Sequence, residues 1–179
     1  MVYVFLAEGF EESEAVVPID LLRRAGIKVR TVGVTSTTPT GAHGLTLMSD
    51  ISEETFLPDD RIEAILLPGG MPGTTNLENS ETVKRAIRLA SEKDITVAAI
   101  CAAPSILAHA GLLDGKKATV HPSFSKELED SYTDQPVVYD PPFLTARAAG
   151  SAVDFALRLI EILKGKRASD KVAADICHQ

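Results

Sequence analysis

The sequence predicts a single α/β domain over residues 1–179, with a doubly wound, mostly parallel sheet and helices on both faces. Short, continuously apolar runs such as Val2–Leu6 and Ile95–Ile100 are typical of strands buried on both sides. Helical periodicity appears between and after such runs, most clearly over Ser151–Lys164, where apolar residues recur at spacings of three and four. Strands alternating with helices over short connections favour a parallel sheet, and 179 residues suit one domain.

The first half of the chain opens with a β–α–β unit. After the strand Val2–Leu6, a helix is predicted over Glu14–Ala25, with Gly26 ending it. The β-branched run Lys28–Val34 predicts the second strand, and the polar residues 35–44 predict a loop. Further along, we expect a small hairpin or edge strand over Leu45–Ile51, a strand over Ile62–Leu67 and a helix over Val83–Ala90.

The second half continues the alternation. The strand Ile95–Ile100 leads into a helix over Ala103–Ala110 that Gly111 ends. In an open sheet of this kind, ligands bind beyond the carboxyl ends of the strands, so site residues should directly follow several strands. Short strands are expected over Ala118–Val120, Val137–Tyr139 and Phe143–Thr145, before the helix Ser151–Lys164.

Composition excludes several classes of function. The net charge of −7 argues against sequence-independent binding of nucleic acid, which needs Lys and Arg. Neither a secretory signal nor an apolar run of about 18 residues is visible, so no membrane segment is expected. The two cysteines, Cys101 and Cys177, form no disulfide framework and have no metal-ligand spacing, which predicts a reducing, cytoplasmic location and no metal or cofactor. Cys177 lies near the end of the chain, where mobile tails are common, and is interpreted as incidental.

Cys101 is the strongest candidate for a nucleophile. A strand runs directly into it, and small residues and a helix follow, which is the layout of a nucleophile elbow. The amides of the following helix would point at the sulfur and lower the pKa of the thiol. The elbow alone does not exclude a buried, inert cysteine, because free cysteines are often buried.

Other polar or glycine-rich positions follow further strands. Gly69 and Gly70 come after Ile62–Leu67 and could offer backbone N–H groups to an oxyanion, although a plain turn is the better explanation of this motif taken alone. Glu14 is either a general acid/base or a carboxylate that caps a helix. His121 ends a short strand and is either a site residue or an ordinary surface or core histidine. Their common position beyond strand ends favours one site.

At this point the chain resembles the DJ-one/ThiJ/PfpI superfamily. The resemblance runs in order from Val2 to about Ala174 and therefore covers nearly the whole chain. It is carried by five blocks: Ala7-Glu-Gly-Phe-Glu-Glu-Ser-Glu-Ala15, Leu67-Pro-Gly-Gly70, Ala98-Ala-Ile-Cys-Ala-Ala-Pro104, Val120-His-Pro122 and Thr145-Ala-Arg-Ala-Ala-Gly150.

The resemblance implies a flavodoxin-like three-layer sandwich, a homodimer and the roles of several residues. It implies Cys101 as nucleophile, with a protonated Glu14 hydrogen-bonded to the thiolate. It also implies oxyanion-binding amides at Gly70 and Ala102, beside Gly69, and a histidine near the thiol at His121. Two positions depart from the family pattern and contribute to the pocket or to dimer contacts: Arg147 precedes Ala-Ala-Gly instead of Gly-Pro-Gly, and His43 stands where an arginine is usual.

Three functions remain open. The first is an enzyme without a cofactor that converts 2-oxoaldehydes such as methylglyoxal or glyoxal to 2-hydroxy acids through a Cys101 hemithioacetal, or that acts on glycated protein, with Glu14 as acid/base. The second is a redox-sensing stress-response chaperone that uses oxidation of Cys101. The third is a cysteine peptidase or amidase, which Ala102 disfavours because hydrolase-like relatives carry a histidine after the nucleophile.

Overall fold

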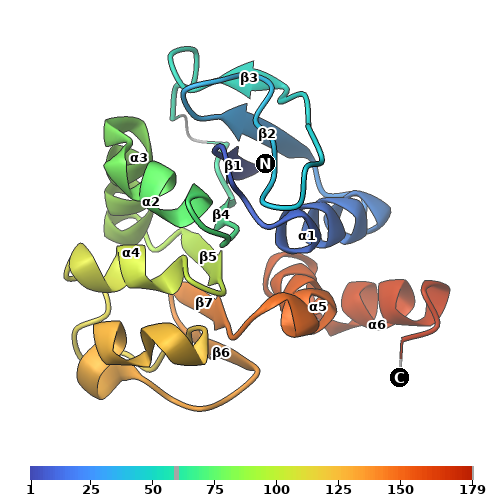
Figure 1. Cartoon of the computed structure of the whole chain (residues 1–179). Coiled ribbons are helices and arrows are strands. Elements are labelled where there is room, and N and C mark those ends of the chain that lie inside the picture. The colour runs from blue at the N-terminus through green and yellow to red at the C-terminus, as the bar shows by residue number, and fades with distance from the viewer. Residues whose placement is uncertain (59–60, 179) are drawn as a thin grey trace.

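A single mixed sheet forms the centre of the molecule (Figure 1). The structure is a computed structural model and describes residues 1–58 and 61–178. The strands in these residues are β1 (Val2–Leu6), β2 (Val29–Gly33), β3 (Ile51–Ser52), β4 (Ala64–Leu67), β5 (Thr96–Ile100), β6 (Val137–Asp140) and β7 (Phe143–Ala146). Their order across the sheet is β3-β2-β1-β4-β5-β7-β6, and only β6 and β7 pair antiparallel. The central order β2-β1-β4-β5-β7 is that of a flavodoxin-like sheet, which confirms the predicted fold class.

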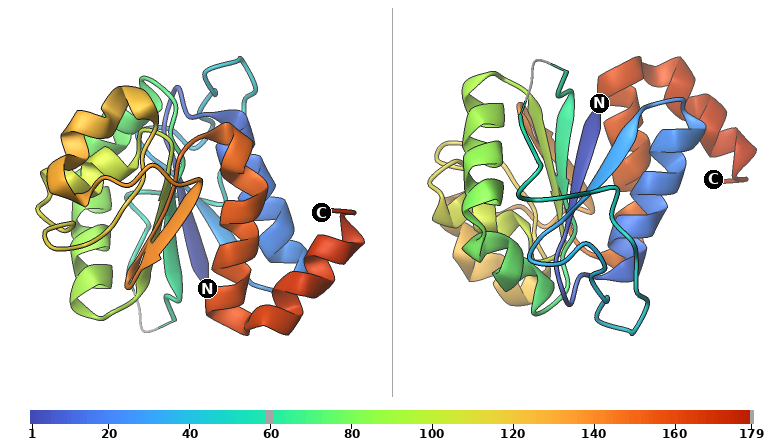
Figure 2. Two further views of the ribbon diagram at one scale, coloured as in Figure 1. Left: turned by 90° about the horizontal axis from the view of Figure 1, so that it is seen from below. Right: turned by 90° about the horizontal axis from the view of Figure 1, so that it is seen from above.

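Helices cover both faces of this sheet, so the molecule has three layers (Figure 2). One face is covered by α1 (Glu12–Arg24), α5 (Ala152–Lys164) and α6 (Lys166–Asp175). The other is covered by α2 (Gly73–Asn79), α3 (Glu81–Glu92), α4 (Pro104–His109) and the 3-10 helix η1 (Pro122–Ser131). A short 3-10 turn, η2 (Ala149–Ser151), precedes α5.

Alternation along the strands supplies the core of each layer. On β1, Phe5 faces α2 and α3, whereas the next residue, Leu6, faces α1 and α5. On β4, Leu67 faces α2 and α3, and Leu66 faces α1 and α5. Because both faces are covered, these strands show the continuous apolar runs seen in the sequence, rather than an alternation of apolar and polar residues.

Most predicted elements are present within a few residues of their predicted bounds. The first helix begins at Glu12, two residues before the predicted start, so that Glu14 lies inside the helix instead of at its cap. Gly26 ends α1 with a positive φ of 70°, as expected for a residue that follows a helix. The hairpin or edge strand predicted over Leu45–Ile51 is present only in fragments: Thr46 makes an isolated antiparallel bridge with Thr40, and Ile51 begins the two-residue edge strand β3.

Other predictions are wrong or incomplete. Ala118–Val120 forms only an isolated bridge between Ala118 and Tyr132, because no neighbouring strand continues the ladder there. The sequence reading missed α2, η1 and α6, which carry few large apolar residues. The C-terminal segment is also not a free tail. Helix α6 packs on α5 through the buried Val172, and His178 pairs with Asp154 at 2.9 Å.

The different burial of two leucines predicts different stabilities for their alanine variants. Leu66 is fully buried in the sheet and Leu57 is 77% exposed. We expect Leu66→Ala to lower the free energy of unfolding by about 2–5 kcal/mol, because a cavity remains in a packed core. The matched variant Leu57→Ala should change it by less than about 0.5 kcal/mol. Urea denaturation followed by circular dichroism measures both, and equal effects would contradict the burial described here.

Candidate active site

Cys101 lies on a sharp turn directly after β5. Its backbone has φ 63°, a left-handed conformation that is uncommon outside glycine and that marks local strain. Two hydrogen bonds hold this turn. The Cys101 N–H donates to the Ala146 carbonyl at the end of β7 (2.9 Å), and the Cys101 carbonyl accepts from the His121 N–H (2.8 Å). The elbow predicted from the sequence is therefore fixed from two further segments, and the thiol remains partly exposed.

Glu14 is the side chain that faces this thiol from α1. It lies in the first turns of α1, and only 1% of the residue is exposed. Its Oε2 accepts a hydrogen bond from the Gly69 N–H at 2.9 Å, and its carboxyl group is also hydrogen-bonded to Cys101 and to the backbone of Ala149. Glu14 therefore joins α1 to residues that follow β4, β5 and β7, and the capping alternative is wrong.

Burial dominates the electrostatics of Glu14. Desolvation raises the pKa of this carboxyl group to about 7, against the hydrogen bonds from Cys101 and Gly69, which act to lower the pKa. The negative charge of Glu11 raises it further. A carboxyl group with a pKa near neutrality can both accept and donate a proton at physiological pH, as acid/base catalysis requires.

The expectation of a thiol with a low pKa is wrong for the state in which Glu14 is ionised. Burial and the negative charge of Glu14 raise the pKa of Cys101 to about 12. The backbone N–H groups of Ala102 and Gly70 hydrogen-bond to the thiol and act to lower its pKa, but they do not outweigh these two effects. Helix α4 is only six residues long, so its dipole adds little. Protonation of Glu14 removes the repulsion and thereby favours the thiolate.

The two glycines after β4 are required by close contacts. A Cβ on Gly69 would lie 2.7 Å from the Cys101 Cβ and 2.7 Å from Glu14 Oε2. Gly70 has φ +89°, and a Cβ there would lie 2.4 Å from the Glu11 nitrogen. Glycine at both positions therefore lets this turn pass between α1 and the elbow and aim the Gly70 N–H at the sulfur.

His121 lies at the elbow through its backbone, and its imidazole has a different partner. Its backbone N–H binds the Cys101 carbonyl, whereas its Nδ1 lies 2.6 Å from the Ser123 hydroxyl oxygen. Among the described residues, no hydrogen bond joins the His121 imidazole to the Cys101 sulfur.

The two departures from the family pattern make ion pairs at the margins of the site. Nδ1 of His43 lies 3.0 Å from Glu12 Oε2 and 3.3 Å from Glu11 Oε2. Arg147 follows Ala146, whose carbonyl accepts the Cys101 N–H, and the Nη2 of Arg147 pairs with Asp134. Sequence reasoning missed the parts played by Glu11, Glu12 and the Ala149 backbone. The only sequence signal for these residues is their position after the predicted strands Val2–Leu6 and Phe143–Thr145.

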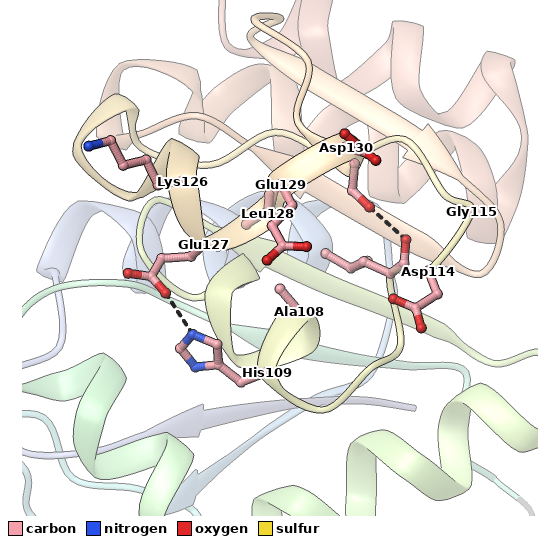
Figure 3. A pocket seen from close by; sticks show the side chains of 11 residues that line it. Ala108, His109, Asp114, Gly115, Lys126, Glu127, Leu128, Glu129 and Asp130 are labelled. Atoms are coloured by element: carbon pink, nitrogen blue, oxygen red, sulfur yellow. Dashed lines mark hydrogen bonds and ion pairs between the residues drawn. The ribbon is translucent and has the colours of Figure 1, made fainter.

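A cavity lies away from this thiol. It has a volume of about 470 Å³ and is lined by residues at the end of α4, in the following turn and in η1, among them His109, Asp114 and Glu127 (Figure 3). None of the residues that contact Cys101 lines it.

The sheet order and the elbow together define a flavodoxin-like α/β protein with a cysteine on the strained turn after β5. Residues 1–162 match the DJ-1/PfpI family, and the chain belongs to this family.

Curated relatives and solved structures agree with this assignment. The chain is 36% identical to the protein dj-1beta of Drosophila melanogaster, over 95% of this chain and 92% of the relative. It is 33% identical to the Parkinson disease protein 7 homolog of Danio rerio (97% and 94% covered) and 30% identical to a deglycase of Pyrococcus abyssi (91% and 99%). The crystal structure of Drosophila melanogaster DJ-1beta superposes with a TM-score of 0.95 at 35% identity, covering 99% of this chain and 97% of that one.

The raised pKa of Glu14 predicts a pH-dependent stability. Glu14 keeps its proton up to about pH 7 in the folded protein, against a pKa of 4.5 for an ordinary glutamate. Its stabilising contribution is therefore fully present below about pH 4.5 and is lost as the pH rises through about 7. The free energy of unfolding of the native protein, relative to Glu14→Gln, should fall by roughly 3 kcal/mol across this window. Urea denaturation between these pH values tests this, and a difference that is constant or rises with pH would contradict it.

The close contacts of Gly69 predict a second, steric effect. We expect Gly69→Ala to displace the Cys101 and Glu14 side chains and to slow alkylation of Cys101 by iodoacetamide by about tenfold or more, because the donors around the sulfur move apart. Gly150→Ala is the matched control, since a Cβ at Gly150 meets no atom within 4 Å and its φ is not positive. Equal alkylation rates in the two variants, measured by mass spectrometry, would show that the contact at Gly69 does not position the site.

Proposed function

We propose that this protein is an enzyme without a cofactor that converts 2-oxoaldehydes, such as methylglyoxal and glyoxal, to 2-hydroxy acids. The observation that carries the proposal is the buried pair of Cys101 and Glu14, with a nucleophile and a proton carrier in direct contact. Conversion of a 2-oxoaldehyde to a 2-hydroxy acid is an internal redox rearrangement followed by hydrolysis. It needs a nucleophile, a movable proton and water, and no external oxidant.

The first step forms a bond between Cys101 Sγ and the aldehyde carbon. The ionised Glu14 takes the thiol proton as this bond forms and then passes it to the aldehyde oxygen, which gives a hemithioacetal and leaves Glu14 ionised again. The N–H groups of Gly70 and Ala102, which already point at the sulfur, are suited to hold the oxygen as negative charge develops on it.

The second step moves a proton between neighbouring carbons. Ionised Glu14 removes the hydrogen from the hemithioacetal carbon as a proton and returns it to the former ketone carbon, through an enediol. The hydroxyl proton of the hemithioacetal moves to the former ketone oxygen in the same rearrangement. The product is a thioester of the 2-hydroxy acid. Water then hydrolyses the thioester, which releases the acid and restores the Cys101 thiol. A pKa of about 7 lets Glu14 act in both directions.

His121 is proposed as a second proton carrier. Its backbone contact with Cys101 holds the residue at the elbow. Because Ser123 engages its Nδ1, Nε2 is left to exchange a proton with the departing Cys101 sulfur or with water during hydrolysis of the thioester. Glycated protein is a further candidate substrate, since a relative from Pyrococcus abyssi carries the name deglycase and the same thiol addition applies to early glycation adducts.

A homodimer in the cytoplasm is part of this proposal. Val16 on α1 and Leu45 and Met48 in the loop before β3 are large apolar residues that are 41%, 58% and 83% exposed. Val16 and Met48 line one hollow beside α1, which a second copy could cover. None of the helices in the described part of the chain is long and apolar enough to span a membrane.

The proposed chemistry predicts the effect of three substitutions on lactate release from methylglyoxal. Cys101→Ser and Glu14→Gln should each lower kcat/KM by about 10²-fold or more, because each removes a group that touches the reacting atoms. Cys177→Ser should leave the rate unchanged, since Cys177 is an exposed residue after α6.

Three outcomes would count against this proposal, and two of them would favour another function. A Cys101→Ser variant that keeps the native rate contradicts the proposal. Absence of lactate, together with conversion of Cys101 to a sulfinic acid by mild peroxide, would favour redox sensing instead. Cleavage of casein that depends on Cys101 would favour a peptidase.

A further inference from the structure

A second group of polar side chains lies at the start of α1, at the margin of the Cys101 site. Glu11 is the residue before α1, Glu12 is its first residue, and His43 comes from the loop after β2. Nδ1 of His43 lies 3.0 Å from Glu12 Oε2 and 3.3 Å from Glu11 Oε2, and the three atoms lie within 4.8 Å of one another. One nitrogen and two carboxylate groups thus offer ligand atoms within 4.8 Å of one another.

Each carboxylate is oriented through its other oxygen. Glu12 Oε1 accepts the backbone N–H groups of His43 (2.7 Å) and Leu45 (3.3 Å). Glu11 Oε1 accepts the hydroxyl of Ser13 at 3.1 Å. In both residues Oε2 is therefore left to face the imidazole. Outer hydrogen bonds of this kind orient the ligands of metal sites in proteins.

The backbone holds the histidine loop in place over Glu12. The Ala42 N–H donates to the Phe10 carbonyl at 2.8 Å. A Cβ on Gly41 would lie 2.4 Å from the Cδ and Oε1 of Glu12, so only glycine allows the loop to close this tightly around the carboxylate. The three groups are brought together by the fold and not by side-chain flexibility alone.

The chemistry of the three groups matches a zinc ion better than it matches a shared proton. A single Nδ1–H can point well at only one of the two carboxylates. Ligands about 2.0–2.2 Å from a tetrahedral Zn²⁺ lie roughly 3.3–3.6 Å from one another, close to the two distances found here. Imidazole nitrogen and carboxylate oxygen are common zinc ligands, and a charge of +2 would balance both carboxylates. The His43 side chain is 72% exposed, which leaves a path for the ion and room for water as a fourth ligand.

We propose that Glu11, Glu12 and His43 form a binding site for Zn²⁺ or a similar divalent first-row transition metal ion. The site is separate from the Cys101 thiol, and the proposal does not depend on the proposed enzymatic activity. The sequence did not predict it, because the ligands come from two segments about 30 residues apart.

His109 provides a matched control within the same chain. It also has two carboxylates as partners, but on opposite ring nitrogens: Nδ1 lies 2.6 Å from Glu78 Oε1, and Nε2 lies 2.9 Å from Glu127 Oε2, the latter visible in Figure 3. The two oxygens cannot meet at one point across the ring. We therefore interpret His109 as an ion-pairing residue without a metal.

The experiment is a titration of the full chain with ZnCl₂, followed by isothermal calorimetry and native mass spectrometry. The protein carries Cys101→Ser and Cys177→Ser, so that no thiol competes for the ion. We expect one Zn²⁺ per chain. Adding His43→Gln or Glu11→Gln should weaken binding by about tenfold or more, whereas adding His109→Gln should leave it unchanged. Circular dichroism verifies that each variant is folded.

Imidazole nitrogen chemical shifts locate the ion directly. On addition of Zn²⁺, Nδ1 of His43 should shift strongly while the nitrogens of His109 do not. The proposal is overturned if His43→Gln and His109→Gln bind Zn²⁺ equally well, if no ion binds, or if one ion is bound between two chains. In the first two cases, Glu11, Glu12 and His43 form an ion pair only.

Discussion

The hydrogen bond from the Gly69 N–H to Glu14 is the interaction on which the rest of the site depends. It connects α1, on one face of the sheet, with the turn after β4, and it places the carboxyl group directly against the Cys101 elbow. A buried carboxyl group without such partners would be costly, whereas here backbone N–H groups of Gly69 and Ala149 partly offset its desolvation. The shape of the glycine turn therefore depends on this contact, whereas the raised pKa of Glu14 follows from its burial.

The thiol and the carboxyl group have to be considered as a unit. The negative charge of Glu14 raises the pKa of the Cys101 thiol, whereas the hydrogen bond from Cys101 acts to lower the pKa of Glu14. Loss of the first proton gives a single negative charge that the pair shares with the N–H groups of Gly70 and Ala102. The pair as a whole, and not either residue alone, has the titration behaviour that matters for reactivity.

Sequence reasoning predicted the layers and the main site because both leave strong local signals. Apolar strands buried on two faces are visible as runs, and the positions of Gly69 and Cys101 follow from the ends of two of these runs. It failed where the signal is not local. The direction of the shift in the thiol pKa depends on burial and on the distance to Glu14, which no motif gives. Helix α6 has only a narrow apolar stripe around Val172, and the convergence of His43 on Glu11 appears only once the loop has closed.

The bond between the Cys101 N–H and the Ala146 carbonyl has a consequence for synthesis of the chain on the ribosome. The elbow is made 45 residues before the strand that holds it, and the Glu14 carboxyl group needs the backbone of Ala149 as well. A growing chain therefore carries Cys101 in an unformed turn until β7 and η2 have left the ribosomal tunnel. During this interval the cysteine has the ordinary chemistry of an unfolded thiol, and the special environment of the site is acquired only when nearly the whole domain has been made.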